Sequence, residues 1–542
     1  MSLVTLLLIV GVIFIIAYFT YGTYLERKLG VNPKRHTPAV EVDEGVDYVA
    51  ARKPVLLGHH FATIAGGGPI VGPVSAAVFG WIPAVIWIVL GSIFLGGVHD
   101  YASLQASILH KAQSIGTIIK EDIGGRGQTL FLSFSIATLI LIVGVFVILV
   151  RDTFVNVPEA ATSSMLFIGL ALAFGVLVNQ VRMNFVVASV FGVVAMFACV
   201  WIGNMFPFEL SGTAWVVILL IYAYVASILP VWMLLQPRDY LNSFLLYGMM
   251  FGATLGILVA NPVIKMAGYT SFYNPTLGYL FPILFITVAC GAVSGFHSLV
   301  SSGTTAKQLD NEKNGKFITY GGMLIEGFLA VIAIGSVAFL TQADFTARLA
   351  ELGGPIPTFS AGIGFLMSSF GIPEAVGTTF VALVASAFLM TTLDSATRLG
   401  KFAVQEFEEG KSKFFTNQHM ATLVVVVGAG LLAVSGTWNK VWPLFGSANQ
   451  MLGALALLAV SAWLVKKGVK AWFTIIPMIL MFVITLSALG VLIYENLFTG
   501  ESPNYFLAGA SFVLLVLCVF LIFEAWQSIM KIKHDEDTPI EA

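Results

Sequence analysis

Apolar segments of about 20 residues or more follow one another through most of this chain, and they limit what it can fold into. A helix of that length crosses a bilayer, where every backbone polar group must be satisfied within the chain. Only 10% of the 542 residues are charged, whereas soluble domains carry about 25%. We therefore predict an all-α polytopic membrane protein with fifteen spans between Leu3 and Met530, surrounded by the lipid bilayer.

Lysine and arginine are concentrated in alternate loops of this arrangement. The loop after the first span is basic, and so is every second loop that follows, up to Lys531 and Lys533 after the last span. Basic loops mark the cytoplasmic side of a membrane protein. We therefore expect an external N-terminus and a cytoplasmic C-terminus. Spans two to six and seven to eleven then begin with opposite orientations, as an inverted repeat requires.

The expected organisation follows from that repeat. An accessory helix (1–30) and a cytoplasmic loop (31–54) precede two inverted five-helix units (55–205 and 206–400), and accessory helices (401–530) with a cytoplasmic tail (531–542) follow them. The accessory helices contain almost no internal charge, so we interpret them as scaffold or as the surface of a homo-oligomer. Within them, the amides of Asn449 and Gln450 are expected to hold helices together by hydrogen bonds.

The second span contains the stretch GHHFATIAGGGPIVGP, which starts at Gly58 and resembles a loop more than a helix. Three glycines run into Pro69, which lacks an amide hydrogen and disfavours the preceding helical turn. Interrupted helices form the substrate and ion sites of many secondary transporters, whereas a Gly-Pro kink can serve close helix packing alone. We favour a site, with the candidate residues His59, His60, Thr63, Gly66, Gly67 and Gly68. A second interruption is expected in span seven, at Ser227 and Pro230.

Another polar stretch, CGAVSGFHSLVSSGTTAKQL from Cys290, lies in the predicted ninth span, Leu280–Ser302. If this stretch is helical, the spacing i, i+3, i+4 and i+7 brings four polar side chains to one face. These are Ser294, His297, Ser298 and Ser301, with Ser302 beside them. A polar stripe on a membrane helix must face protein or water. Hydroxyls suit a dehydrated Na⁺ or a substrate carboxylate, and the alternative is hydrogen bonding between packed helices.

Few ionisable residues lie inside the predicted spans, so each is a candidate for function. Asp100 is interpreted either as a proton relay or as an ion-pair partner for basic residues at the membrane surface. Glu326 is either a coupling acid or a protonated packing residue. Asp394 and Arg398 are spaced i, i+4 at the end of the predicted span Phe359–Thr392, and we expect them to pair with each other.

Other functional classes have less support. Imidazoles suit transition metals, but no metal-binding spacing accompanies the histidines, so neither a metal nor another cofactor is expected. The three cysteines lie far apart in apolar segments, and no basic patch suits nucleic acid. The loops are too short for a catalytic or sensory output domain, so we expect no enzymatic activity. The unequal spans argue against a channel built from repeated subunits.

Six longer motifs are spread over the chain. They are GHHFATIAGGGPIVGP at Gly58, GGVHDYASLQAS at Gly96, QPRDYLNSFLLYG at Gln236, SGFHSLVSSGTT at Ser294, TTLDSATRLGKF at Thr391 and WPLFGSANQML at Trp442. Together they resemble the carbon starvation protein A family over about Tyr48 to Leu464. The resemblance implies a leucine-transporter-like fold of the APC superfamily, with five-plus-five inverted repeats. It also implies an inner-membrane importer of peptides or, with proton coupling, of pyruvate.

The resemblance further implies where a coupling ion and a substrate bind. A cation site is expected between the backbone of Ala62–Ala65 and the hydroxyls of Ser301 and Ser302. Hydroxyls favour Na⁺ and the histidines favour a proton, and the resemblance favours H⁺. The substrate carboxylate is expected at the amide-bearing start of the half-helix after the break, on Gly67, Gly68 and Thr63.

We therefore predict a cation-coupled secondary importer of small carboxylated nutrients such as pyruvate or short peptides. The alternative is a membrane nutrient sensor or metal-binding protein without transport. The candidate substrate-binding residues are Thr63, Gly66, Gly67, Gly68, Ser227, His297 and Ser298. The candidate coupling residues are His59, His60, Asp100, Ser301, Ser302 and Glu326.

Overall fold

A computed structural model describes residues 1–42, 44–45, 47–275, 277–409, 412–435, 438–498 and 503–537. The first half is helical: α1 (Leu3–Phe19), α2 (Tyr21–Lys28), α3 (Pro38–Val42), α4 (Lys53–Ile64), α5 (Gly68–Ala76), α6 (Trp81–Gly91), α7 (Gly97–Leu109), α8 (Ile115–Asp122), α9 (Gly125–Asn156), α10 (Pro158–Asn179), α11 (Phe185–Met205), α12 (Gly212–Ile228) and α13 (Leu235–Ala260). A π-turn at Ser92–Gly96 joins α6 to α7, and a 3₁₀ turn at Ala77–Phe79 follows α5.

The second half begins with a two-stranded hairpin, and helices follow it. The elements are β1 (Tyr273–Asn274), β2 (Gly278–Tyr279), α14 (Phe285–Thr287), α15 (Ala289–Ala292), α16 (Gly295–Val300), α17 (Gly315–Ile318), α18 (Tyr320–Ala338), α19 (Gln342–Glu351), α20 (Pro355–Ser368), α21 (Glu374–Phe407), α22 (Gln418–Ser435), α23 (Trp438–Lys466), α24 (Trp472–Phe498) and α25 (Tyr505–Asp537). The strands pair antiparallel. Short π- and 3₁₀ segments lie at Leu280–Leu284, Ser301–Thr305 and Glu312–Asn314.

The described residues form 11 helices long and apolar enough to cross a membrane, or 12 if the bent pair of α4 and α5–Phe79 is one span. Fewer spans pass this test than the sequence predicted, partly because α12 and α22 are shorter. The predicted single span Phe359–Thr392 is wrong. It divides into α20 and α21, because Gly371 has a positive φ of 96° and Pro373 directly precedes α21.

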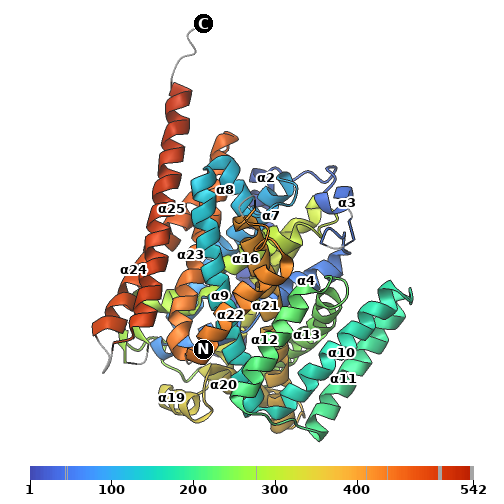
Figure 1. Cartoon of the computed structure of the whole chain (residues 1–542). Helices are drawn as coiled ribbons and strands as arrows, with labels where there is room; N and C mark the ends of the chain where they lie inside the picture. The colour runs from blue at the N-terminus through green and yellow to red at the C-terminus, as the bar shows by residue number, and fades with distance from the viewer. Residues whose placement is uncertain are drawn as a thin grey trace.

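The helices form one bundle with two distinct edges (Figure 1). The hairpin of α10 and α11 lies at one edge, and α24 with α25 lies at the other. Between them α9 packs lengthwise on α21, α22 and α23. Helices α2, α3 and α8 gather at one end of the bundle, which we call the α8 end, and α19 lies at the opposite end.

The predicted interruption of the second span is confirmed. Helix α4 ends at Ile64, α5 begins at Gly68, and the two are bent by 43°. A side chain on Gly66, Gly67 or Gly68 would collide with Thr392, Leu389 and Cys290, respectively. The three glycines therefore let the broken segment lie directly against α21 and the α15 region, as close packing between membrane helices requires.

A second interruption lies in residues 280–305, not in span seven. Helix α15 ends at Ala292, Val293 and Ser294 are extended, and α16 begins at Gly295. The expectation for Ser227 and Pro230 is wrong, because α12 ends at Ile228 and Pro230 lies in the following turn. Proline there ends a helix instead of bending it.

The two interrupted segments run side by side in opposite directions. The His60 Nδ1 lies 2.8 Å from the Thr305 hydroxyl. Further along the first segment, Gly68 contacts Cys290, and Gly72 contacts the backbone of Thr287. Residue numbers rise in one segment as they fall in the other, so both breaks lie together in the bundle interior.

Candidate functional site

The first break leaves three backbone donors free. Among the described residues, the amides of Gly66, Gly67 and Gly68 have no backbone acceptor, and no side chain caps the start of α5. All three glycines are buried. Free amides at a helix start attract negative charge, because the helix dipole places partial positive charge there. A carboxylate group satisfies such donors.

The other side of this break is already satisfied. The Thr392 hydroxyl on α21 donates to the Thr63 carbonyl across 3.1 Å. The hydroxyl of Thr63 donates to the His59 carbonyl in its own helix, 2.8 Å away. Thr63 therefore contributes a held carbonyl, while its side chain is engaged within α4.

Two histidines and two acids form a chain across the second break. His99 Nδ1 lies 2.7 Å from Asp100 Oδ1, and His297 Nδ1 lies 3.3 Å from Asp100 Oδ2. On its other nitrogen, His297 Nε2 lies 3.5 Å from Glu326 Oε2. All four side chains are buried. The structure thus brings together Asp100, His297 and Glu326, which lie in three separate predicted spans. We call His99, Asp100, His297 and Glu326 the His–acid chain.

The hydroxyl residues near this chain take different positions. Ser298 Oγ lies 3.0 Å from His99 Nδ1, so Ser298 contacts the chain directly. Ser302 donates to the Ser298 carbonyl at 2.8 Å, within its own helical segment. The Ser301 hydroxyl is buried and has no hydrogen-bond partner in the described part of the chain. Donation leaves the lone pairs of the Ser302 oxygen available, so the expected cation site on Ser301 and Ser302 stays a prediction.

Asn449 fixes the second break, as the sequence predicted for this buried amide. Its Oδ1 accepts from the Phe296 amide at 2.8 Å, and its Nδ2 donates to the Ser294 hydroxyl at 3.0 Å. The side chain on α23 therefore serves as the N-cap of α16, which no residue of its own provides. Gln450 has no such bond within the described residues.

A second charged network ties α4 to the helices around it. His59 Nδ1 lies 2.8 Å from Asp239 Oδ2, and Asp239 Oδ1 lies 3.1 Å from Arg238 Nη2. Arg238 also pairs with Asp394 of α21. Tyr222 of α12 donates to Asp394 across 2.5 Å. All the charges are buried, so each depends on the others for compensation.

The expected pair of Asp394 and Arg398 is therefore wrong. Arg398 instead donates to the carbonyls of Ala226 and Leu229 at the end of α12. Ala226 lies in the last turn of α12 and Leu229 directly follows it, where backbone carbonyls lack helical partners. Asp394 and Arg398 are one turn apart on α21, but each bonds to a group of another helix that interhelical packing brings closer.

The side chain and carbonyl of Ser227 bond to residues outside the two breaks. Its hydroxyl donates to Tyr224 O at 3.1 Å and to Thr422 Oγ1 at 3.3 Å, and Lys401 donates to its carbonyl at 2.8 Å. These contacts join α12 to α21 and α22. Ser227 therefore connects the end of α12 to its neighbouring helices.

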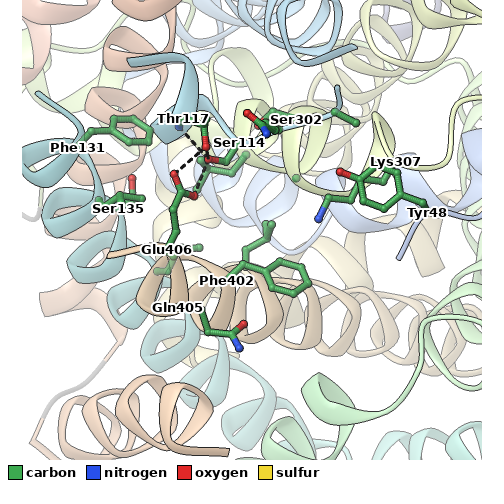
Figure 2. A pocket seen from close by; sticks show the side chains of 18 residues that line it. Tyr48, Ser114, Thr117, Phe131, Ser135, Ser302, Lys307, Phe402, Gln405 and Glu406 are labelled. Atoms are coloured by element: carbon green, nitrogen blue, oxygen red, sulfur yellow. Dashed lines mark hydrogen bonds between the residues drawn. The ribbon is translucent and has the colours of Figure 1, made fainter. Parts of the chain in front are cut away.

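A cavity of about 320 Å³ opens beside the start of α8, and Figure 2 shows its lining. The polar lining residues include Ser114, Thr117, Ser135, Ser302, Lys307, Gln405 and Glu406, and the aromatic ones are Tyr48, Phe131 and Phe402. Ser302 lies in the same helical segment as His297, so one segment connects the His–acid chain with this cavity. Sequence reasoning missed the cavity, because its lining comes from segments far apart in the chain.

Sequence reasoning also missed the roles of Arg238, Asp239 and Thr392. A signal was available for the first two, because a buried Arg-Asp pair stands in the motif QPRDYLNSFLLYG. For Thr392 nothing in the local sequence indicates that it bonds to another helix. Among the described residues, no group of three His, Cys, Asp or Glu side chains is arranged to hold a metal ion.

Comparisons with known proteins show the family of the chain. The family described as Carbon starvation protein CstA matches residues 2–352 and 346–488. The chain is 33% identical to the peptide transporter CstA of Escherichia coli K12, over 92% of this chain and 82% of that protein. It is 30% identical to the pyruvate/proton symporter BtsT of the same strain, over 97% of this chain and 92% of that protein. The peptide transporter CstA of Bacillus subtilis 168 is 30% identical and is matched over 99% of its length.

Among solved structures, the fold is similar to a mutant of the manganese transporter of Eremococcus coleocola. The TM-score is 0.55 with 11% sequence identity, over 91% of this chain and 99% of that one. At this identity the likeness concerns the fold alone. It agrees with the predicted all-α membrane architecture.

Proposed function

Since this chain belongs to the carbon starvation protein CstA family and is a multi-pass membrane transporter, we propose that it imports small carboxylated nutrients by proton-coupled alternating access. The cargo is pyruvate or a short peptide, which are the substrates named for its relatives. Both carry a carboxylate. The observation that supports the proposal best is the set of free amides at Gly66, Gly67 and Gly68, because buried donors of this kind suit a carboxylate and Gly68 lies beside the second broken segment, against Cys290.

The His–acid chain is proposed as the proton path. Imidazole nitrogens and carboxylate oxygens lie 2.7 to 3.5 Å apart along this chain, and the contact of His297 Nδ1 with Asp100 Oδ2 is a hydrogen bond through which a proton can pass. His297 lies one turn after the second break, so a proton there is close to the bound cargo. The free hydroxyl of Ser301 supports Na⁺ as the alternative coupling ion.

We propose that the two interrupted segments are corresponding members of an inverted repeat. A broken segment, a long helix and then three more helices occur in the order α4–α5, α6–α7, α9, α12, α13. The same order occurs in 280–305, α17–α18, α21, α22, α23, when α8 in the first set and α19 and α20 in the second are treated as connections. The fourth members are both short, at 17 and 18 residues. This order favours units of 53–260 and 280–466, with α10–α11 as an insertion. The alternation of basic loops in the sequence predicted other boundaries, 55–205 and 206–400, and these stay a prediction.

The orientation in the membrane is proposed from the loop charges. The α8 end carries the basic segments around residues 31–54 and 111–126, and basic loops stay on the cytoplasmic side. We therefore assign the α8 end to the cytoplasm of a cell whose plasma (inner) membrane holds the protein. The cavity beside α8 then opens toward the cytoplasm.

Counterflow in proteoliposomes tests the function. The purified full chain is reconstituted with unlabelled pyruvate or dialanine inside, and uptake of the labelled compound is measured with and without imposed pH and Na⁺ gradients. Accumulation that follows the pH gradient supports proton-coupled import. Accumulation that follows only the Na⁺ gradient would show that Na⁺, and not a proton, is the coupling ion. Saturable binding without accumulation would instead favour a sensor, and an unsaturated current would favour a channel.

A further inference from the structure

The cavity beside α8 is lined by Lys307, whose ammonium has no acid partner within 4.0 Å among the described residues. Lys307 Nζ lies 4.8 Å from the centroid of the Phe402 ring and 5.4 Å from that of Tyr48. Within the described part of the chain, no carboxylate lies within 4.0 Å of this nitrogen. Aromatic faces attract a cation but do not neutralise it. The ammonium of Lys307 is therefore a positive charge in the cavity that is available to a ligand.

The acid of the same cavity is already occupied. Glu406 accepts hydrogen bonds from Ser114 Oγ at 2.6 Å, Thr117 Oγ1 at 3.2 Å and Gln128 Nε2 at 3.1 Å. Figure 2 shows this carboxylate turned toward Ser114 and Thr117, away from Lys307. Three donors stabilise its negative charge, so it does not need the ammonium and does not repel a ligand held beside Lys307 as strongly as a free acid would.

A second unpaired polar group lines the same cavity. The Ser135 hydroxyl on α9 is 1% exposed and has no hydrogen-bond partner among the described residues. A buried hydroxyl without a partner costs free energy unless a ligand or water satisfies it. The volume of about 320 Å³ is at the lower end of the range of small-molecule pockets.

We propose that this cavity is a second binding site, in which Lys307 binds the carboxylate of a small organic acid. The site rests on the proposed transport function, in which cargo is released to the cytoplasm, the side toward which the cavity is proposed to open. Lys307 and His297 belong to one continuous stretch, 295–307, which links the two sites. The cavity is thus specific for anionic cargo at the cytoplasmic step.

Transport from the two membrane faces tests this assignment. We compare right-side-out and inside-out vesicles that contain the wild type, Lys307→Gln, Lys307→Arg or the control Lys313→Gln, which alters an exposed lysine of the next loop. Lys307→Gln should raise the half-saturating pyruvate concentration at the cytoplasmic face by about tenfold, the loss of about 1.4 kcal/mol, and leave the external value unchanged. Lys307→Arg and Lys313→Gln should resemble the wild type. Equal changes at both faces, or no change, would overturn the site.

A labelling experiment tests the site independently of transport. Ser135→Cys is placed in a Cys199→Ala background, since Cys290 and Cys518 are buried. Pyruvate or dialanine should slow the reaction of this cysteine with a polar thiol reagent in the detergent-solubilised full chain. Adding Lys307→Gln should abolish that protection. Protection without counterflow would refute the transport function and keep the carboxylate site, whereas protection that survives Lys307→Gln, or none at millimolar ligand, refutes the site.

Discussion

The hydroxyl of Thr392 donates a hydrogen bond to the carbonyl of Thr63, 3.1 Å away, at the point where the first broken segment leaves its helix. Thr392 belongs to α21 and Thr63 to α4, so one bond connects the interrupted segment to the helix that packs along α9. It satisfies a carbonyl that has lost its own helical amide. The break is thereby stabilised from outside its own segment.

Thr392→Val is expected to destabilise the protein and reduce transport. The change keeps the shape of the side chain but leaves the Thr63 carbonyl unpaired in the membrane interior, at a cost of about 1–3 kcal/mol. Thermal unfolding in detergent and pyruvate counterflow measure the two effects. Thr391→Val is the matched control, because the Thr391 hydroxyl bonds only to Ala387 within α21. Equal effects of the two variants would show that the interhelical bond is unimportant.

The amides at the first break can be tested with two variants that share the same change in packing. A bulky replacement such as Gly67→Leu is unsuitable, because a side chain there collides with Leu389 and that variant is not expected to fold normally. We therefore combine Leu389→Ala with either Gly67→Ala or Gly67→Pro. Gly67 has φ of −66°, which proline adopts, so the two double variants differ mainly in the presence of one N–H group.

If that N–H holds a carboxylate, only the proline variant should lose affinity. A hydrogen bond to a charged group contributes about 1.5–3 kcal/mol, so the half-saturating pyruvate concentration should rise by about ten- to hundredfold. Uptake kinetics in proteoliposomes give this value. Similar kinetics for the alanine and proline variants would remove Gly67 from the carboxylate site.

Glu326→Gln is expected to separate exchange from accumulation. The substitution keeps the shape of the side chain near His297 but removes a group that can release a proton. Counterflow, which needs no net proton movement, should continue, whereas accumulation driven by a pH gradient should be lost. Glu374→Gln, at the exposed start of α21, is the control. Normal pH-driven accumulation by Glu326→Gln would exclude this acid from the proton path.

Asp394→Asn is expected to be strongly destabilising. It leaves the buried Arg238 guanidinium without its α21 partner, and breaking a buried ion pair costs about 3–5 kcal/mol. Removing both charges with Arg238→Met and Asp394→Leu should cost less than the two single changes added together. The partly exposed pair of Arg151 and Asp152 provides the comparison, because Arg151→Gln should cost less, at about 1 kcal/mol. Unfolding temperatures that rank these variants otherwise would contradict the structural role.

The charge on Lys307 should make the cytoplasmic step sensitive to pH. Burial lowers the pKa of Lys307, and the nearby acids oppose this shift while a nearby arginine adds to it. The charged and titratable groups around it are Asp47, Glu44, Glu406, Arg398, Lys401 and Tyr48. Burial raises the pKa of Tyr48, so its phenol stays neutral and does not compete for the ammonium.

The sign of the pH effect follows from the lowered pKa. Lys307 is charged below that pKa and loses its proton as the pH rises through it. The half-saturating pyruvate concentration at the cytoplasmic face should therefore rise at alkaline pH in the wild type. In Lys307→Arg it should stay constant over that range, because a guanidinium keeps its charge. The same pH dependence in both proteins would show that another group titrates.

Much of the architecture was predictable because it depends on local chemistry. Long apolar segments favour membrane helices, and three glycines before Pro69 interrupt one of them whatever its neighbours are. The interruption was predicted correctly for this reason. The prediction for Pro230 failed because a proline ends a helix as readily as it bends one. Local sequence does not distinguish these outcomes.

The pairing of buried groups was not predictable in the same way. Asp394 has Arg398 one turn away in its own helix, yet it pairs with Arg238 of α13, and Arg398 turns to the end of α12. Asp100, His297 and Glu326 could each be selected as a membrane-embedded polar residue, but nothing in their spacing places them in one chain.

Residue types along the chain thus specify where helices run and where one must break, since these properties depend on a few neighbouring peptide units. They do not specify which polar groups meet. In a membrane interior an unpaired charge is so costly that each takes whichever partner interhelical packing brings within reach. Those distances arise only when all the helices are in place.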